Sequence, residues 1–320
     1  YRLMRLPPAS DPHDEARTAA LDGPPHSPER DRQAVSFHYD VSNDFYRLWL
    51  DSQMVYSCAY FTDERNDLDR AQIDKFDHLC RKLRLRPGQQ LLDIGCGWGG
   101  LAIHAARHYH VQVTGVTLST EQATLAAERV RDAGASGRVK IELRDYRDVR
   151  PPTGGFDAIV SVGMAEHVGR EHLPEYFRTA ATLLRPGGVF LNHAISEGRR
   201  ADRFRGPSFV DAYVFPDSDI PPLPVVTAAA ASADLEVRDV ENLREHYTLT
   251  LRHWIRRLEA AHEAALAFVD ERTYRIWRLY MAGSAHGFAH GDLAIYQTLL
   301  VKPDAEGHAR LPLTRNDWYE

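Results

Sequence analysis

The sequence predicts an α/β fold with a mostly parallel, doubly wound β-sheet, and three observations carry this prediction. The apolar segment 91–94 runs directly into a glycine-rich turn at 95–100 that opens a helix. Short apolar segments then alternate with longer segments that have helical periodicity. Arg-Pro-Gly at 86–88 and at 185–187 separates a helix from the strand that follows it.

The expected elements follow in a regular order. A helix at 68–83 has apolar side chains at helical spacing, with Ile73, Phe76 and Leu79 on one face. Strands are expected at 90–94, 112–117, 140–143, 158–162, 189–194 and 295–301, and further helices after residue 99 and at 120–133 and 173–184. Because strands and helices alternate, the strands are expected to run parallel, with ligand chemistry at their carboxyl ends.

The remaining segments define the expected domain organisation. Residues 1–34 are rich in Pro, Asp, Arg and His without apolar periodicity, which predicts a flexible N-terminal tail. One domain is expected over 35–305, followed by a C-terminal tail at 306–320. Residues 251–281 are helical in pattern, so a helical cap insertion is expected within about 196–290.

The composition excludes several classes of protein. The chain has 320 residues, of which 43% are hydrophobic and 26% charged, as in ordinary globular proteins. No apolar run is long enough to cross a membrane and no signal peptide opens the chain, so a cytoplasmic protein is expected. Cys58, Cys80 and Cys96 lack the spacing of a zinc site, and no metal is expected. A net charge of −6 argues against nucleic acid as a partner. Transient contact with a membrane surface stays open. The arginine cluster at 199–205 is expected to be a solvated loop.

The glycine-rich turn is the strongest indication of a ligand. Gly95 and Gly97 allow positive φ and leave backbone free for close approach, and acidic Asp93 stands two residues before the first glycine. The turn lacks the Lys-Ser/Thr pair of a phosphate loop and the spacing of the dinucleotide fingerprint. A carboxylate beside glycines suits the ammonium and sulfonium end of S-adenosylmethionine, which is therefore the expected cofactor. The alternative is a tight turn without a ligand.

Polar and aromatic residues after the next two strands complete the expected cofactor site. Thr117, Leu118 and Gln122 follow the second strand, where neutral polar groups would meet the ribose hydroxyls. Asp145 and Tyr146 follow the third strand, where a carboxylate would accept from the adenine amine and an aromatic ring would cover the base. A solvated turn is the alternative for Asp145. The aromatic and polar segment 36–61 is also typical of a ligand wall.

Several motifs occur together in one order along the chain: FHYD at 37–40, NDF at 43–45, YSCAYF at 56–61, LDIGCGWG at 92–99, VTLS at 116–119 and SVGMAEHVG at 161–169. In this order they resemble the family of cyclopropane fatty-acid synthases and mycolic-acid cyclopropane synthases. The resemblance covers residues from about 36 to 303. It implies the Rossmann-like fold of class I S-adenosylmethionine-dependent methyltransferases, with a seven-stranded sheet and a helical cap over the active site.

The resemblance also implies a reaction and its residues. Enzymes of this family add a methylene group from S-adenosylmethionine to the cis double bond of an unsaturated acyl chain, as in a phospholipid. A bound bicarbonate ion would remove the proton from the transferred methyl group. On the matching motifs its holders are Cys58, Glu166, His193, Ile195 and Tyr247, and the cofactor set gains Tyr56 and Ser57.

Other readings stay open from the sequence. A C-methyltransferase of the same family, acting on an acyl chain or another alkene, would leave a methyl or methylene product. A protein that binds S-adenosylmethionine without catalysis is an alternative of another class. Taken singly, Cys58 could be a small buried apolar residue, His193 a satisfied residue at a strand end and Tyr247 a cap aromatic. A homodimer also stays open.

Overall fold

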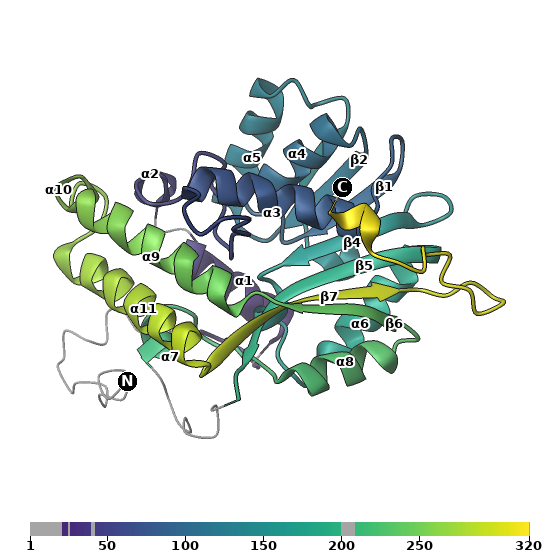
Figure 1. Cartoon of the computed structure of the whole chain (residues 1–320). Coiled ribbons are helices and arrows are strands. Elements are labelled where there is room, and N and C mark those ends of the chain that lie inside the picture. The colour runs from purple at the N-terminus through teal and green to yellow at the C-terminus, as the bar shows by residue number, and fades with distance from the viewer. Residues whose placement is uncertain (1–20, 25, 40–41, 200–208, 320) are drawn as a thin grey trace.

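A seven-stranded β-sheet forms the centre of the molecule (Figure 1). The computed structural model describes residues 21–24, 26–39, 42–199 and 209–319. The strand order is β3-β2-β1-β4-β5-β7-β6. The strands are β1 (Gln90–Ile94), β2 (Gln112–Thr117), β3 (Val139–Leu143), β4 (Phe156–Val162), β5 (Leu184–Glu197), β6 (Glu236–Asn242) and β7 (Leu293–Val301). Neighbouring strands among β1 to β5 pair in parallel, and only β7 is antiparallel to its neighbours, so the expected mostly parallel, doubly wound sheet is confirmed.

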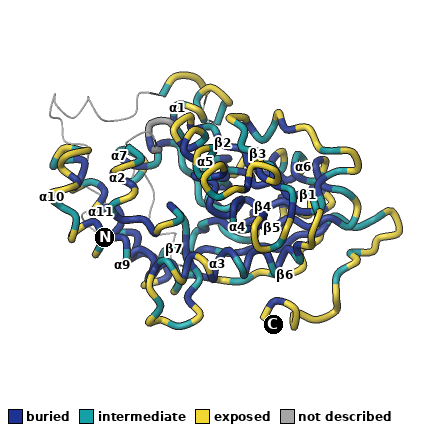
Figure 2. The backbone as a smooth tube through the Cα atoms, turned by 90° about the horizontal axis from the view of Figure 1, so that it is seen from above, coloured by how far each residue is buried: buried dark blue, intermediate teal, exposed yellow. Residues whose placement is uncertain are grey.

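Helices cover both faces of the sheet because successive strand residues point to opposite sides. Leu91 packs in the apolar cluster under one set of helices, whereas Leu92 packs in the cluster under the other set. The first set comprises α3 (Leu68–Lys82), α4 (Gly100–His108) and α5 (Thr120–Asp132), and the second comprises α6 (Leu173–Leu183) and α8 (Leu223–Ala231). Figure 2 shows the central strands as the most buried part of the chain, with exposed residues on the outer helices and loops.

A third, largely aromatic core joins the helical cap to residues 45–61. Trp49, Trp254 and Trp277 are buried there, with ring centroids 5.6 Å apart for Trp49 with Trp254 and for Trp49 with Trp277. The elements around this core are α2 (Asn43–Arg47), α7 (Phe209–Tyr213), α9 (Arg244–Ala260), α10 (His262–Ala265) and α11 (Glu271–His290). Figure 1 shows α9 and α11 side by side beyond one end of the sheet. The helical cap lies at the end where β5 finishes and β7 begins.

The N-terminal part differs from the expected flexible tail at 1–34. Residues 1–20 lie outside the described residues, but helix α1 (Pro28–Tyr39) begins within the expected tail. The helix has no apolar periodicity and is held instead by ion pairs, since Arg30 pairs with Asp217 and Asp31 pairs with Arg147 at 2.9 Å. These partners are more than a hundred residues away in sequence, so no local pattern indicates the helix.

The structure differs from the expected elements at three other places. The helical pattern at 251–281 is interrupted, because α9 ends at Ala260 and a short connection precedes α11. The resemblance implies seven strands, but the sequence pattern placed only six of them, and β6 is the one that it did not locate. On α3, Ile73 is 38% exposed although Phe76 and Leu79 on the expected face are buried. Residues 200–208, which hold most of the arginine cluster, lie outside the described part, and within that part no helix is long and apolar enough to cross a membrane.

Candidate functional site

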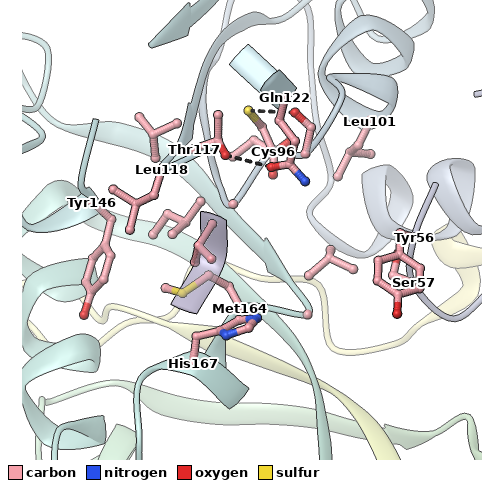
Figure 3. A pocket seen from close by; sticks show the side chains of 18 of the residues that line it. Tyr56, Ser57, Cys96, Leu101, Thr117, Leu118, Gln122, Tyr146, Met164 and His167 are labelled. Atoms are coloured by element: carbon pink, nitrogen blue, oxygen red, sulfur yellow. Dashed lines mark hydrogen bonds between the residues drawn. The ribbon is translucent and has the colours of Figure 1, made fainter. Parts of the chain in front are cut away.

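A cavity lies where the carboxyl ends of β1, β2 and β4 meet, the position expected for ligand chemistry in a parallel sheet. The glycine turn after β1, the residues after β2 and the residues after β4 form its walls. Figure 3 shows Tyr146 on one side of this cavity and Tyr56 with Ser57 on the opposite side, with Met164 and His167 between them. The cavity is therefore elongated, with an aromatic ring at each end.

The glycine turn combines a crowded position at Gly95 with an open one at Gly97, and both have positive φ. Gly95 has φ +77°, and a Cβ atom there would lie 3.1 Å from Met164 Cγ. Gly97 has φ +54°, but a Cβ atom there would meet no atom within 4 Å. Since Gly97 lines the cavity, the open space before it is available to a ligand that presses against backbone. This is an observation that fits the expected nucleotide-type cofactor.

Two charged side chains are enclosed at the Ser57 side of the cavity. Asp93 is buried, and its Oδ2 atom has no hydrogen-bond partner among the described residues. Burial raises the pKa of Asp93 to about 7, although the Lys75 ammonium lowers it. Burial lowers the pKa of Lys75 to about 8, and Lys75 Nζ donates to Ser57 Oγ at 2.8 Å. An acid and a base with such neighbouring pKa values are typical of functional sites.

The β2 side of the cavity is polar and preorganised. Thr117 Oγ1 donates to Gln122 Oε1 at 2.8 Å, and Ser119 caps α5 by accepting from the Gln122 backbone N–H at 3.2 Å. Both bonds fix the loop that carries Leu118 into the cavity wall (Figure 3). The residues expected to meet the ribose, Thr117, Leu118 and Gln122, thus lie on one turn that is held by hydrogen bonds.

Asp145 does not take part in this cavity. Its carboxylate accepts from the Arg147 backbone N–H and side chain, with Nε at 2.9 Å and Nη2 at 2.6 Å. The pairing neutralises the buried acid and closes the short helix at Tyr146–Asp148. Asp145 does not line the cavity, whereas all other expected cofactor residues do: Tyr56, Ser57, Asp93, Gly95, Gly97, Thr117, Leu118, Gln122 and Tyr146.

The expected anion-holding residues are not among the residues that line the cavity. Glu166 Oε1 accepts from the Ile195 backbone N–H at 2.7 Å, and Glu166 Oε2 is buried without a partner among the described residues. Burial raises the pKa of Glu166 to about 7, against the effect of that backbone donor. His193 stands on the same strand, β5, and burial holds its pKa well below the usual range, so its imidazole is neutral. The Nε2 atom of His193 also lacks a partner in the described part.

Cys58 and Tyr247 both donate a hydrogen bond to the backbone carbonyl of Leu243. The Leu243 carbonyl accepts from Cys58 Sγ at 3.8 Å and from the Tyr247 backbone N–H at 3.1 Å. The Leu243 N–H donates to the carbonyl of Ile295, which pairs with Ile195 across β5 and β7. Burial raises the pKa of Cys58, so it remains a thiol. These bonds link Cys58 and Tyr247 through Leu243 to the β5–β7 strand pair, which carries His193 and Ile195, and Glu166 is bound to Ile195.

The two groups of residues are immediate neighbours. Ser57 lines the cavity and precedes Cys58 in the chain. Gly163 lines the cavity, and its N–H donates to the His193 carbonyl at 2.9 Å. Met164 and His167, which enclose Glu166 in sequence, both line the cavity as well. Residues of the cavity wall are therefore sequence neighbours of Cys58 and Glu166 and a backbone hydrogen-bond partner of His193.

Sequence reasoning missed some lining residues, of which Lys75 and Trp98 are the most informative. Trp98 is inside the glycine motif, and its Nε1 donates to Asn43 Oδ1 at 2.7 Å, which ties the turn to α2. Lys75 had a usable signal, because it lies four residues before Leu79 and seven after Leu68 on the buried stripe of α3.

Comparison with known proteins gives a consistent assignment. The family model described as "Mycolic acid cyclopropane synthetase" matches residues 26–298. A "Probable fatty acid methyltransferase" of Pseudomonas putida is 51% identical over 92% of this chain and 75% of that protein. The "Cyclopropane-fatty-acyl-phospholipid synthase" of Escherichia coli K12 is 38% identical over 83% of this chain and 66% of that protein. The crystal structure of mycolic acid cyclopropane synthase CmaA1 complexed with SAH and CTAB superposes with a TM-score of 0.79 at 34% identity, covering 84% of this chain and 97% of that one.

Proposed function

The chain belongs to the mycolic acid cyclopropane synthetase family, and from this premise we propose that it adds a methylene group from S-adenosylmethionine across a cis double bond of an unsaturated acyl lipid. The family and the fold are those of S-adenosylmethionine-dependent methyltransferases that act on lipids. The observation that carries the proposal is that residues of the glycine-turn cavity are directly bonded, in the chain or by a backbone hydrogen bond, to the residues of the buried group around Glu166 and His193.

The chain's residues fit S-adenosylmethionine at the cavity. Gly97 leaves open space against the backbone, and the partnerless Oδ2 of Asp93 is an acceptor suited to an ammonium group. Tyr146 stands at the far end, where its ring would cover a base. When bound, the cofactor supplies an electrophilic methyl group, to which the π electrons of the alkene form a bond while the sulfur keeps the electron pair of the broken bond. The cavity walls would hold the two reactants in line and exclude water.

The second group of residues fits a small anion such as bicarbonate. Two buried polar atoms, Glu166 Oε2 and His193 Nε2, lack partners among the described residues, and an ion with both a hydroxyl and acceptor oxygens would satisfy both. Bicarbonate would supply the base that takes a proton from the added methyl group, after which the ring closes. Glu166 then has the role of a holder, since its Oε1 is already bound to the Ile195 N–H.

Aromatic faces at the Tyr56 end would stabilise positive charge on the acyl chain. The Tyr56 ring lies 5.2 Å from that of Trp254 and 5.4 Å from that of Trp49, centroid to centroid. Burial raises the pKa of Tyr56, so the ring carries no charge of its own and acts through its quadrupole. A carbocation in a dry, aromatic site survives long enough for its proton to be removed.

A second product is favoured by one specific observation. The Pseudomonas putida relative, which is 51% identical, is named a fatty acid methyltransferase. The same cation would give a methylene product if a hydride shifted along the chain before the proton left. This C-methyltransferase reaction on an acyl chain shares the alkylation step. The added methyl group loses the proton in both reactions, and the methylene product differs by the hydride shift that comes first.

Product analysis decides between these functions. The chain is incubated with isotopically labelled S-adenosylmethionine and a phospholipid that has a cis-unsaturated acyl chain, and the lipids are examined by mass spectrometry before and after mild hydrogenation. A gain of one CH₂ with no remaining olefin supports the cyclopropane. A gain of one CH₂ with a reducible olefin supports the methylene product. Binding of the cofactor without transfer to any alkene would exclude both and leave a non-catalytic binding protein.

A further inference from the structure

Lys75 on helix α3 is one of the residues that line the cavity. Lys75 is 1% exposed and lines the cavity wall, in contrast to the usual solvent exposure of lysine. Its Nζ donates to Ser57 Oγ, and Ser57 is fixed in turn because its carbonyl accepts from Gln72 Nε2 at 3.0 Å. Removing an ammonium from water is costly, so a lysine that is held there without full compensation indicates a role for its charge.

The carboxylates near Lys75 compensate it only in part. The Asp51 carboxylate is occupied, since Oδ1 accepts from the Val55 N–H and Oδ2 from the Gln53 N–H, both at 2.8 Å. Asp93 acts on Lys75 electrostatically, yet its Oδ2 has no hydrogen-bond partner in the described part of the chain. An ammonium has three N–H donors, and Ser57 Oγ is the acceptor that the described residues give to one of them. Lys75 can therefore bind a further acceptor inside the cavity.

The other cations of the cavity wall are committed elsewhere. Arg147 pairs with Asp145 and Asp31, and Arg144 pairs with Glu142 at 2.9 Å. Both arginines stand near Tyr146 in sequence, whereas Ser57 lies at the opposite side of the cavity (Figure 3). If the adenine base of the cofactor lies against Tyr146, the amino-acid end of the cofactor lies beside Lys75 and Asp93.

We propose that Lys75 binds the methionyl carboxylate of S-adenosylmethionine while Asp93 binds the methionyl ammonium. The inference rests on the proposed assignment of this cavity to that cofactor. The amino-acid end of the cofactor is a zwitterion, and the cavity presents two enclosed side chains of opposite charge at one end. Each charged pair would form in a water-poor site, where charge-assisted hydrogen bonds are strong. Ser57 acts as the positioning residue that directs the Lys75 ammonium.

Equilibrium binding tests this proposal with two ligands and four proteins, the wild type and three variants. Calorimetry compares S-adenosylmethionine with decarboxylated S-adenosylmethionine, which keeps the sulfonium and the amine but lacks the carboxylate. For Lys75→Met, the affinity for the first ligand falls at least about tenfold, whereas that for the second changes less than about twofold. Lys75→Arg retains part of the affinity because it keeps the charge.

Lys82→Met is the matched control. Lys82 is also 1% exposed on α3, but it pairs with Glu241 at 2.5 Å and does not line the cavity. Its substitution leaves the affinities for both ligands unchanged, as followed beside thermal unfolding of each variant. Equal loss of both ligands in Lys75→Met, or no loss, overturns the proposal and leaves Lys75 as a structural counter-ion.

The wild-type chain gives an independent test should Lys75→Met fail to fold. It binds S-adenosylmethionine at least about tenfold more tightly than the decarboxylated form, and equal affinities contradict the inference. Because the assay contains no alkene, its outcome is separate from the proposed reaction. A chain that binds neither ligand would instead overturn the assignment of the cavity itself.

Discussion

Glu166 Oε1 accepts a hydrogen bond from the Ile195 backbone N–H at 2.7 Å, so one oxygen of this buried carboxylate is fixed while the other is left without a partner. The bond joins the turn after β4 to strand β5. It holds the second oxygen in one orientation. A carboxylate arranged in this way is suited to hold a small ligand, and it makes substitutions at Glu166 informative.

Glu166→Gln will nearly abolish turnover but leave the cofactor affinity within about threefold. The amide keeps an acceptor for the Ile195 N–H, but it replaces the partnerless oxygen with a donor that cannot hold a bicarbonate hydroxyl. The expected loss of kcat is roughly a hundredfold or more. Steady-state kinetics and calorimetry measure the two quantities. Glu128→Gln on the exposed face of α5 is the control. An unchanged kcat in Glu166→Gln would remove this residue from the scheme.

The same variant will change how stability depends on pH. Burial raises the pKa of Glu166 to about 7 from an ordinary 4.5, so the folded chain binds more protons than the unfolded chain between these values. This contribution to the free energy of unfolding is complete below pH 4.5 and is lost as the pH rises through about 7, with a slope on the order of 1 kcal/mol per pH unit.

Urea unfolding between pH 5 and pH 7.5 measures this effect. Relative to the wild type, Glu166→Gln gains stability as the pH rises, because the amide has no proton to lose. Buried histidines such as His193, whose pKa is lowered, act in the opposite direction but are present in both chains and cancel in the difference. Parallel pH curves for the two chains would show that Glu166 is ionised in the folded state.

Gly97→Ala will separate backbone strain from cofactor contact. Gly97 has φ +54° and Gly134 has φ +65°, and a Cβ atom at either meets nothing within 4 Å. Both substitutions to alanine therefore cost about 1 kcal/mol of stability. Only Gly97 faces the cavity, so only Gly97→Ala weakens S-adenosylmethionine binding, by at least about tenfold. Equal affinities of the two variants would place the ligand away from the turn.

Trp318→Ala will destabilise the chain although it lies in the expected C-terminal tail. The indole is 4% exposed, and the cationic groups of Lys82, Arg84 and Arg315 lie 5.3, 5.2 and 5.6 Å from its ring centroid. We expect a loss of about 2 to 4 kcal/mol from lost packing and cation–π contact. Tyr319→Ala is the control, since Tyr319 is 65% exposed and should cost less than about 0.5 kcal/mol. Denaturant unfolding measures both, and equal midpoints would show that the tail does not contribute to stability.

The sheet was predictable where burial is on both faces. Strands β1 and β2 have the expected bounds, because each is a short segment with buried apolar residues next to a turn and a helical pattern. Strand β6 has no such signal. Val237 and Val240 are 36% and 38% exposed, and a register shift between Val237 and Asp239 breaks the alternation that a half-buried strand would show.

The site was predictable where a motif fixes backbone shape. The glycine turn and the residues after β2 line the cavity as expected, since their role depends on local conformation. Asp145 does not line the cavity, and its carboxylate pairs with Arg147, a pairing that the sequence does not indicate. Lys75 was missed because a lysine in a helix is normally a solvated residue.

Strand β6 has a consequence for how copies of this chain meet in concentrated solution. It forms the last position in the sheet, and four of its seven residues are charged: Glu236, Arg238, Asp239 and Glu241. A strand from another molecule that paired here would have to desolvate these ionic groups along an irregular border. This border therefore protects the chain from the edge-to-edge aggregation to which an uncovered apolar strand would be open.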